Sequence, residues 1–152
     1  SKRLVPVVAS GVLKEITMKR LSIVFLFLLS PMVMGQSLYQ QLGEKEGISS
    51  IVEEMLYRVG GDERIVHHFN GVDIVRVHKL ITERVCNVVG GPCEYSGETM
   101  RVSHEGMGIT HADFNALVEH LIIAMEKHNI PVSTQNQLLA KLASMYGDIV
   151  EQ

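Results

Sequence analysis

His104 is the side chain of this sequence that is best placed to bind a metal ion. It stands in a segment broken by glycines, Met100-Arg101-x-x-His104-x-Gly106-x-Gly108-Ile109, between two long stretches with apolar helical periodicity. A neutral imidazole donates a nitrogen lone pair to iron and other transition metals. Because the flanking residues form helix poorly, the ring can turn toward a metal. A single histidine is more often an ordinary solvated or hydrogen-bonded residue, so the residues around His104 must show whether it binds a metal.

The other six histidines give weaker signals. Four of them fall on the polar faces or at the ends of expected helices: His67, His111, His120 and His128. No pair of histidines has the spacing of a zinc site. His78 follows an inward position by one residue, so we expect its ring to point outward, the alternative being a second ligand for a metal bound by His104. His68 precedes Phe69, so we expect its side chain to lie at the edge of the group against which Phe69 packs.

Cys86 and Cys93 are the two cysteines of the chain. We expect Cys86 in the last turns of a helix and Cys93 just past Gly90-Gly91-Pro92, where the chain turns back. In an oxidising compartment they could form a disulfide. The alternative is a small buried Cys86 and a free loop thiol at Cys93, and the sequence leaves both interpretations open.

The first 35 residues differ from the rest. A basic start at Met18-Lys19-Arg20 precedes an apolar run from Leu21 to Leu29 and then Val33-Met34-Gly35. This pattern is typical of a secretory signal peptide, and it predicts cleavage after Gly35 and a periplasmic or otherwise exported protein. The run is short for a transmembrane helix, although an uncleaved N-terminal anchor is the alternative. We therefore divide the chain into an upstream extension (1–17), a signal segment (18–35) and one domain (36–152).

Composition limits the class of the protein. From Gln36 onward, nine Lys and Arg residues stand against sixteen Asp and Glu residues, a formal net charge of −7. This charge argues against nucleic acid and anionic membrane surfaces as partners. The 46% of hydrophobic residues is enough for one buried core, and that core must be mostly aliphatic because Trp is absent.

Helical periodicity covers the chain from Ser37 onward, and no strand pattern competes with it. We expect a short helix over 37–43, a helix ending at Gly60-Gly61-Asp62, and a helical turn that carries Ile65 and Val66 toward Phe69. Further helices are expected from Asp73 to about Val89, from a capping box at 110–113 to about Met125, and from 131 to 149. The stretch 94–108 should be a loop with one or two helical turns.

From Ser37 to Val150 the chain resembles the group I truncated haemoglobins of bacteria. Its landmarks are Leu38-Tyr39 with Leu42-Gly43, Phe69, Gly90-Gly91-Pro92, Tyr95-x-Gly97 and the His104 segment. The resemblance implies an all-α, two-over-two helical sandwich around a haem b. It also implies that His104 is the proximal iron ligand and that Phe69 packs on the porphyrin. Tyr95, Met100 and Arg101 would line the proximal edge, with Arg101 a candidate partner for a haem propionate.

The sequence departs from this family on the distal side of the haem. The family usually places a tyrosine on the second helix and a glutamine or similar group on the fourth, where this chain has Leu56, Val77 and Ile81. Tyr57 is next to the expected tyrosine position, and adjacent helical residues point about 100° apart, so it should face away. Bound oxygen gains most from a buried donor. An apolar distal pocket therefore predicts weak oxygen binding and unimpaired carbon monoxide binding.

The sequence favours a haem-binding globin whose five-coordinate iron reversibly binds O2, CO and NO. The alternative is a haem enzyme for nitric oxide dioxygenation or peroxide chemistry. Such an enzyme would need an unidentified reductase as partner and a polar distal group, and the sequence shows neither clearly. A helical domain that binds zinc or no cofactor is a third interpretation. The sequence does not indicate the oligomeric state, and we expect no stable membrane insertion once the signal segment is cleaved.

Overall fold

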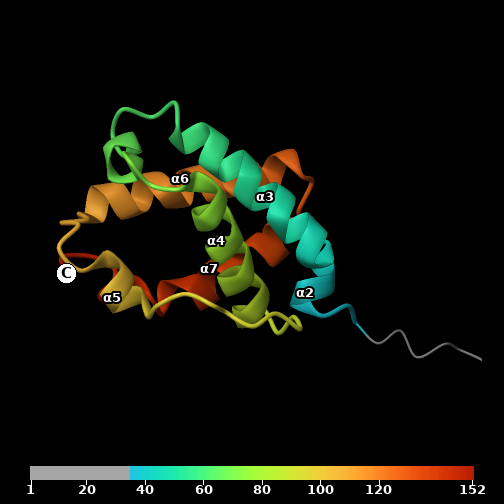
Figure 1. Ribbon diagram of the computed structural model, residues 1–152. Coiled ribbons are helices and arrows are strands. Elements are labelled where there is room, and N and C mark those ends of the chain that lie inside the picture. Colours follow the sequence, from blue (N-terminus) through green and yellow to red (C-terminus); the bar gives the residue numbers. More distant parts are fainter. Residues whose placement is uncertain (1–34) are drawn as a thin grey trace, which may run out of the picture. The chain divides into compact units, whose positions relative to one another are not determined.

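The computed structural model describes residues 35–152, so the predicted signal segment and the upstream extension lie outside the described residues. Within this range every regular element is a helix (Figure 1). The elements are α2 (Leu38–Gln41), α3 (Glu44–Val59), η1 (Val66–Phe69), α4 (Ile74–Val88), α5 (Met100–His104), α6 (His111–Lys127), α7 (Val132–Ala143) and η2 (Tyr146–Asp148). No helix among residues 35–152 is long and apolar enough to cross a membrane.

Side-chain caps explain where several helices begin. The Asp73 carboxylate accepts hydrogen bonds from the amides of Val75 and Arg76 at the start of α4, as the sequence predicts. Thr110 and Asp113 form the predicted capping box at the start of α6. Thr99 caps α5 in the same way, because its hydroxyl accepts from the Val102 amide at 3.3 Å. The loop before His104 therefore ends at Thr99, where α5 begins.

The helices form the two-over-two sandwich that the sequence predicts. Helix α3 packs against both α4 and α6, and α2 packs against α3 and α7. Figure 1 shows α3 and α4 forming one layer, with α6 and α7 behind and below them. The short helix α5 lies apart from this core and packs against η2 near the C-terminal end of the chain.

The core is built from the apolar stripes of the long helices. Apolar residues recur in α3 at three- and four-residue steps, which predicts one apolar face, and all six are buried: Ile48, Ile51, Val52, Met55, Leu56 and Val59. All of them except Val59 join buried side chains of the other long helices: Val85 and Cys86 of α4, Leu121, Ala124 and Met125 of α6, and Leu138 of α7. The core is aliphatic, as composition requires, and the large rings sit at its edge.

The last helix is shorter than the sequence suggests. Residues 131–149 were expected to be one helix, but α7 ends at Ala143 and a short 3-10 turn follows over Tyr146–Asp148. The Ser144 hydroxyl donates to the Lys141 carbonyl at 2.8 Å, and Gly147 has a low helix propensity. The spacing of apolar residues does not predict this helix end, because Met145 and Ile149 still lie at helical intervals.

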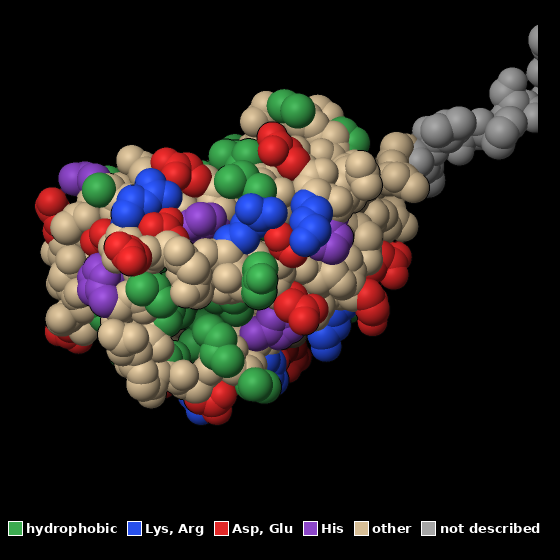
Figure 2. Space-filling view, turned by 90° about the horizontal axis from the view of Figure 1, so that it is seen from above, with side chains coloured by type: hydrophobic (Ala, Val, Ile, Leu, Met, Phe, Trp, Pro, Cys, Tyr) green, Lys and Arg blue, Asp and Glu red, His purple; other side chains and the backbone are tan. Residues whose placement is uncertain are grey.

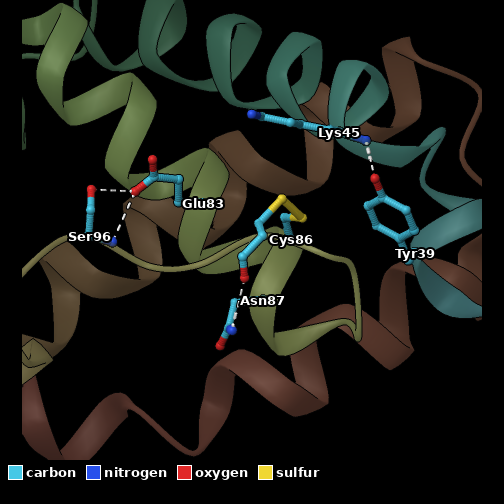
Figure 3. The surroundings of a disulfide bond; sticks show 7 residues. Tyr39, Lys45, Glu83, Cys86, Asn87 and Ser96 are labelled. Atoms are coloured by element: carbon cyan, nitrogen blue, oxygen red, sulfur yellow. Dashed lines mark hydrogen bonds between the residues drawn. A yellow bond between two sulfur atoms is a disulfide. The ribbon is translucent and has the colours of Figure 1, made fainter.

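Cys86 and Cys93 form a disulfide, which decides between the two interpretations left open by the sequence (Figure 3). Their α-carbons are 5.8 Å apart, within the range that a disulfide requires. The Gly91 amide donates to the Cys86 carbonyl at 2.8 Å, and Asn87 donates to the Cys93 carbonyl at 3.2 Å. The bridge thus ties the end of α4 to the loop that leads toward α5.

Candidate functional site

His104 is the last residue of α5, and its ring is half-buried and oriented by the helix itself. Its Nδ1 lies 2.7 Å from the Met100 carbonyl oxygen, one turn earlier. A carbonyl can only accept, so Nδ1 carries the proton in this contact. The other ring nitrogen, Nε2, then keeps its lone pair, which is the form of histidine that binds a metal. Met100, predicted at the proximal edge, thus contributes its backbone to the orientation of His104.

Four predicted lining residues meet at the edge of the hydrophobic core. Phe69, Val77 and Ile81 are partly buried and pack against the buried cluster that includes Leu56. They come from three consecutive elements, α3, η1 and α4. Together they form an apolar surface with no hydrogen-bond donor on any side chain. The structure therefore brings the predicted distal residues and Phe69 into one cluster.

Phe69 is held in place by contacts between η1 and helix α6. It packs against a second small cluster made of Val59, Ile65 and Ala116. Next to it, His68 Nε2 lies 3.2 Å from an Asp113 carboxylate oxygen, and 11% of the His68 side chain is exposed. Hydrogen bonds from the Thr110 backbone and hydroxyl, with a smaller contribution from His68, lower the pKa of Asp113 to about 2.

A second His–Asp pair lies two turns further along α6. His120 Nε2 is 2.7 Å from an Asp62 carboxylate oxygen, and both side chains are largely buried. Hydrogen bonds from Arg64 and then His120 hold the pKa of Asp62 far below its usual value. The expectation that His120 lies on a polar face is wrong. The seven-residue spacing of Asp113 and His120 around the buried Ala116 is a sequence signal for one shared inward face.

An open hollow lies where η1 approaches the segment after His104. Its volume is about 630 Å³, and its lining includes His68, Met107, Gly108 and Asp113. Apolar side chains near both sides of the candidate site are exposed: Val72, Ile74 and Val75 before or at the start of α4, and Val102 and Met107 in and after α5. Figure 2 shows hydrophobic side chains gathered around a hollow in one face, with histidines beside them.

The loop carrying Tyr95 is fastened to α4. The Arg84 guanidinium lies 4.1 Å from the centre of the Tyr95 ring, a cation–π contact. A Cβ at Gly97 would come within 2.3 Å of the Tyr95 hydroxyl oxygen, so a larger residue there would require the Tyr95 ring to shift. The Glu83 carboxylate accepts from the Ser96 amide and hydroxyl (Figure 3). These two bonds lower the pKa of Glu83.

Arg101 has protein partners in this structure. Its guanidinium lies 3.0 Å from Asp148 and also donates to the side-chain oxygen of Gln152. Sequence reasoning, guided by the family resemblance, expected a haem propionate in this role. The two partners come from the C-terminal end of the chain, so spacing around Arg101 gives no hint of them.

Two polar side chains near the distal positions are directed elsewhere. Tyr57 is 80% exposed, as predicted from its position one residue after Leu56. His78 is half-buried and not outward as expected, because its Nε2 lies 3.0 Å from the Ser49 carbonyl of α3. Neither ring therefore adds a hydrogen-bond donor to the apolar surface formed by Leu56, Val77 and Ile81.

The chemistry of these donors fits a metal that brings its own ligands. No group of three or more His, Cys, Asp or Glu side chains among residues 35–152 is arranged to hold a metal ion. His104 offers one ring nitrogen, and the apolar cluster of Phe69, Val77 and Ile81 lies on other helices. A bare cation would gain too few ligands here, whereas an iron already held by four porphyrin nitrogens needs one axial donor and an apolar cover.

Comparisons with known proteins agree with this chemistry. The model of the bacterial-like globin family matches residues 37–151. A group 1 truncated haemoglobin of Mycolicibacterium paratuberculosis is 30% identical over 74% of this chain and 83% of its own length. One from Tetrahymena pyriformis is 28% identical over 67% of this chain and 84% of its own length.

Solved structures show the same arrangement of helices. The crystal structure of truncated haemoglobin from Tetrahymena pyriformis in its Fe(III) form superposes with a TM-score of 0.74 at 25% identity, covering 77% of this chain and all of that one. The 2/2 haemoglobin from Synechococcus sp. PCC 7002, crystallised in the cyanomet state with covalently attached haem, gives a TM-score of 0.70 at 24% identity.

Proposed function

The chain belongs to the bacterial-like globin family, which implies a haem cofactor and the binding of diatomic gases, and on that premise we propose a specific haem-binding role for it. It binds haem b through His104 as the sole protein ligand of the iron. The open sixth position takes O2, CO or NO reversibly. The bound haem supplies the iron at which these gases bind.

The observation that carries this proposal is the contact between His104 Nδ1 and the Met100 carbonyl at 2.7 Å. It fixes the tautomer and directs the lone pair of Nε2 away from the helix that carries it. Phe69, Val77 and Ile81 supply an apolar surface that excludes water from a flat aromatic cofactor. The absence of a donor on Leu56, Val77 and Ile81 favours gas binding over the alternative enzyme chemistry, which needs a polar distal group.

An absorption spectrum of the purified protein with haem tests the proposal. We expect a Soret band that is lost or strongly weakened in His104→Ala and restored when free imidazole is added to that variant. His128→Ala is the matched control, because His128 is an exposed histidine at the end of α6. An unchanged ferrous spectrum in His104→Ala would refute the assignment of the iron ligand.

We also propose that the protein is exported to an oxidising compartment such as the periplasm. The basic and apolar pattern of residues 18–35 supports this, and so does the Cys86–Cys93 disulfide, since disulfides persist mainly outside reducing cytosol. Mass spectrometry of the protein from a periplasmic fraction should find a chain that begins at Gln36. Recovery of only the uncleaved chain, in the cytosolic fraction, would contradict the proposal.

A further inference from the structure

Helix α5 has little to hold it in place by itself. It is five residues long, and loops join it to α4 and α6. Arg101, Val102 and Ser103 are exposed, and Val102 keeps 54% of its surface in contact with solvent. An isolated helix of this length is unstable in water, so its orientation must come from contacts with other parts of the chain. The helical element that it packs against is η2.

Residues 148–152 form a clasp around the segment that carries His104. Before His104, the Arg101 guanidinium pairs with Asp148 at 3.0 Å and with the side chain of Gln152. After His104, the Gly106 amide donates to the Gln152 carbonyl at 3.3 Å, and the Glu151 amide donates to the Ile109 carbonyl at 2.9 Å. These bonds lie on both sides of the histidine along the chain.

The clasp is itself anchored to the main body of the domain. The Gln152 amide group donates to the carbonyls of Gly147 and Val150, both at 2.9 Å. Val150 is 6% exposed, and Tyr146 packs edge-on against Phe114 of α6 with ring centres 4.8 Å apart. The clasp therefore connects α5 to α6 through a buried valine and an aromatic pair.

We propose that the clasp positions His104 for its ligand role, with Arg101 and Asp148 acting as positioning residues. The inference rests on the proposed function, in which Nε2 of His104 binds iron. Arg101 and the two backbone bonds fix both ends of the His104 segment, and the Met100 carbonyl then sets the rotation of the ring. The iron–histidine bond thus depends on residues more than forty positions later in the sequence.

The role differs from the one that family resemblance suggests for Arg101. A guanidinium that serves only a haem propionate would be indifferent to the charge at position 148. A guanidinium that holds α5 to the clasp depends on that charge, because its partner is the Asp148 carboxylate. The two roles therefore predict different results when Asp148 is changed.

The first test removes one backbone bond of the clasp. Glu151 has a φ of 59°, in the left-handed region, and its amide donates to Ile109. Glu151→Pro removes the amide hydrogen and requires a φ near −65°, whereas Glu151→Gly keeps the hydrogen and accepts the positive φ. Both variants lose the carboxylate near His111, so the glycine variant is the matched control.

The readouts are amide hydrogen exchange over residues 100–109 and the iron–histidine stretching band in the resonance Raman spectrum of the ferrous protein. We expect Glu151→Pro to speed exchange about two- to tenfold, as for one lost hydrogen bond, and to shift or broaden the Raman band. Glu151→Gly should leave both unchanged. Equal behaviour of the two variants, or an unshifted band in Glu151→Pro, would overturn the inference.

The second test exchanges the charges of the ion pair. Arg101→Glu and Asp148→Asn should each shift the Raman band and speed exchange of α5 about 1.5- to 5-fold, as expected for a solvent-exposed pair. The double variant Arg101→Glu/Asp148→Arg should recover the wild-type band. Lys141→Gln, which removes a charge from exposed α7 surface, is the control. A band that responds to Arg101→Glu but not to Asp148→Asn, with no recovery in the double variant, would assign Arg101 to the propionate instead.

Failure of the proposed function gives a different result. If the purified chain with added haem shows no iron–histidine band, His104 is not the ligand. Hydrogen exchange in the same variants still measures whether the clasp holds α5. A normal band together with unchanged exchange in Glu151→Pro refutes the clasp alone.

Discussion

Reduction of the Cys86–Cys93 disulfide should lower the free energy of unfolding of the domain. The size of this effect depends on the number of residues between the two cysteines. The bridge closes a short loop, since the two residues are seven positions apart. For a loop of this size the chain-entropy relation gives about 2.5 kcal/mol at 25 °C. With a urea dependence of about 1–3 kcal/mol per molar for small proteins, the unfolding midpoint should fall by roughly 1–2 M.

Urea titration of the ferrous, carbon monoxide-saturated protein with and without a thiol reductant measures this effect. Carbon monoxide keeps the iron in one state, so the reductant changes only the disulfide. The double variant Cys86→Ala/Cys93→Ser is the control and should show the same midpoint in both conditions. Its difference from the reduced wild type measures the packing of both cysteine side chains, of which Cys86 is fully buried in the core and Cys93 is partly buried against it.

Two results would refute this reasoning. One is an identical midpoint for oxidised and reduced wild type, which would mean that closing this loop does not restrict the unfolded chain as the relation requires. The Asn87–Cys93 and Glu83–Ser96 hydrogen bonds of the folded state (Figure 3) would not account for that result, because they are absent from the unfolded chain. The other is the detection of two reactive thiols in protein that was exported and purified in air. In that case the bridge would not form under the conditions in which the protein is made.

Three further variants test other parts of the structure. Leu56→Tyr adds a hydrogen-bond donor to the apolar distal surface and should slow oxygen dissociation roughly ten- to a hundredfold in stopped-flow measurements. The dissociation rate of carbon monoxide should change much less. An unchanged oxygen dissociation rate would mean that another donor already reaches the ligand. The lowered pKa of Asp113 contributes stability that is present above the unfolded pKa of about 4 and is lost as the pH falls through about 2. Asp113→Asn should therefore reduce the loss of folding stability between pH 4 and pH 2, measured by urea unfolding at each pH. The same loss in wild type and variant would show that Asp113 does not cause it. Gly91→Ala places a Cβ 2.6 Å from the Tyr39 ring and from Cys86 Sγ and should cost about 1–3 kcal/mol in urea unfolding, whereas Gly61→Ala, whose Cβ meets nothing closer than 3.6 Å, should cost little; equal costs would contradict the packing argument.

Sequence reasoning succeeded where local physics decides the structure. The apolar stripe of α3 and the caps at Asp73 and Thr110 depend on residues within a few turns, and all three are found as predicted. The stretch 94–108 is predicted to be a loop with one or two helical turns, and α5 is such a turn, although the Thr99 cap at its start is found only in the structure. In each case the relevant partners are close along the chain, so their spacing is informative.

The same reasoning missed polar partners that are distant in sequence. His120 pairs with Asp62 fifty-eight residues earlier, and Arg101 pairs with Asp148 forty-seven residues later. A charged or polar residue gives the same local signal whether it faces water or a buried partner. The spacing of Asp113 and His120 around Ala116 indicates an inward face of α6, but only tertiary packing identifies the distant partners Asp62 and Asp148.

The position of the clasp in the chain has a consequence for biogenesis. Synthesis runs from the N-terminus, so Phe69 and His104 are made well before residues 148–152, which supply two backbone hydrogen bonds and the Arg101 partners to the α5 segment. A growing chain that lacks these last residues cannot make those contacts. The contacts that the clasp makes with the α5 segment therefore form only after residues 148–152 have been synthesised.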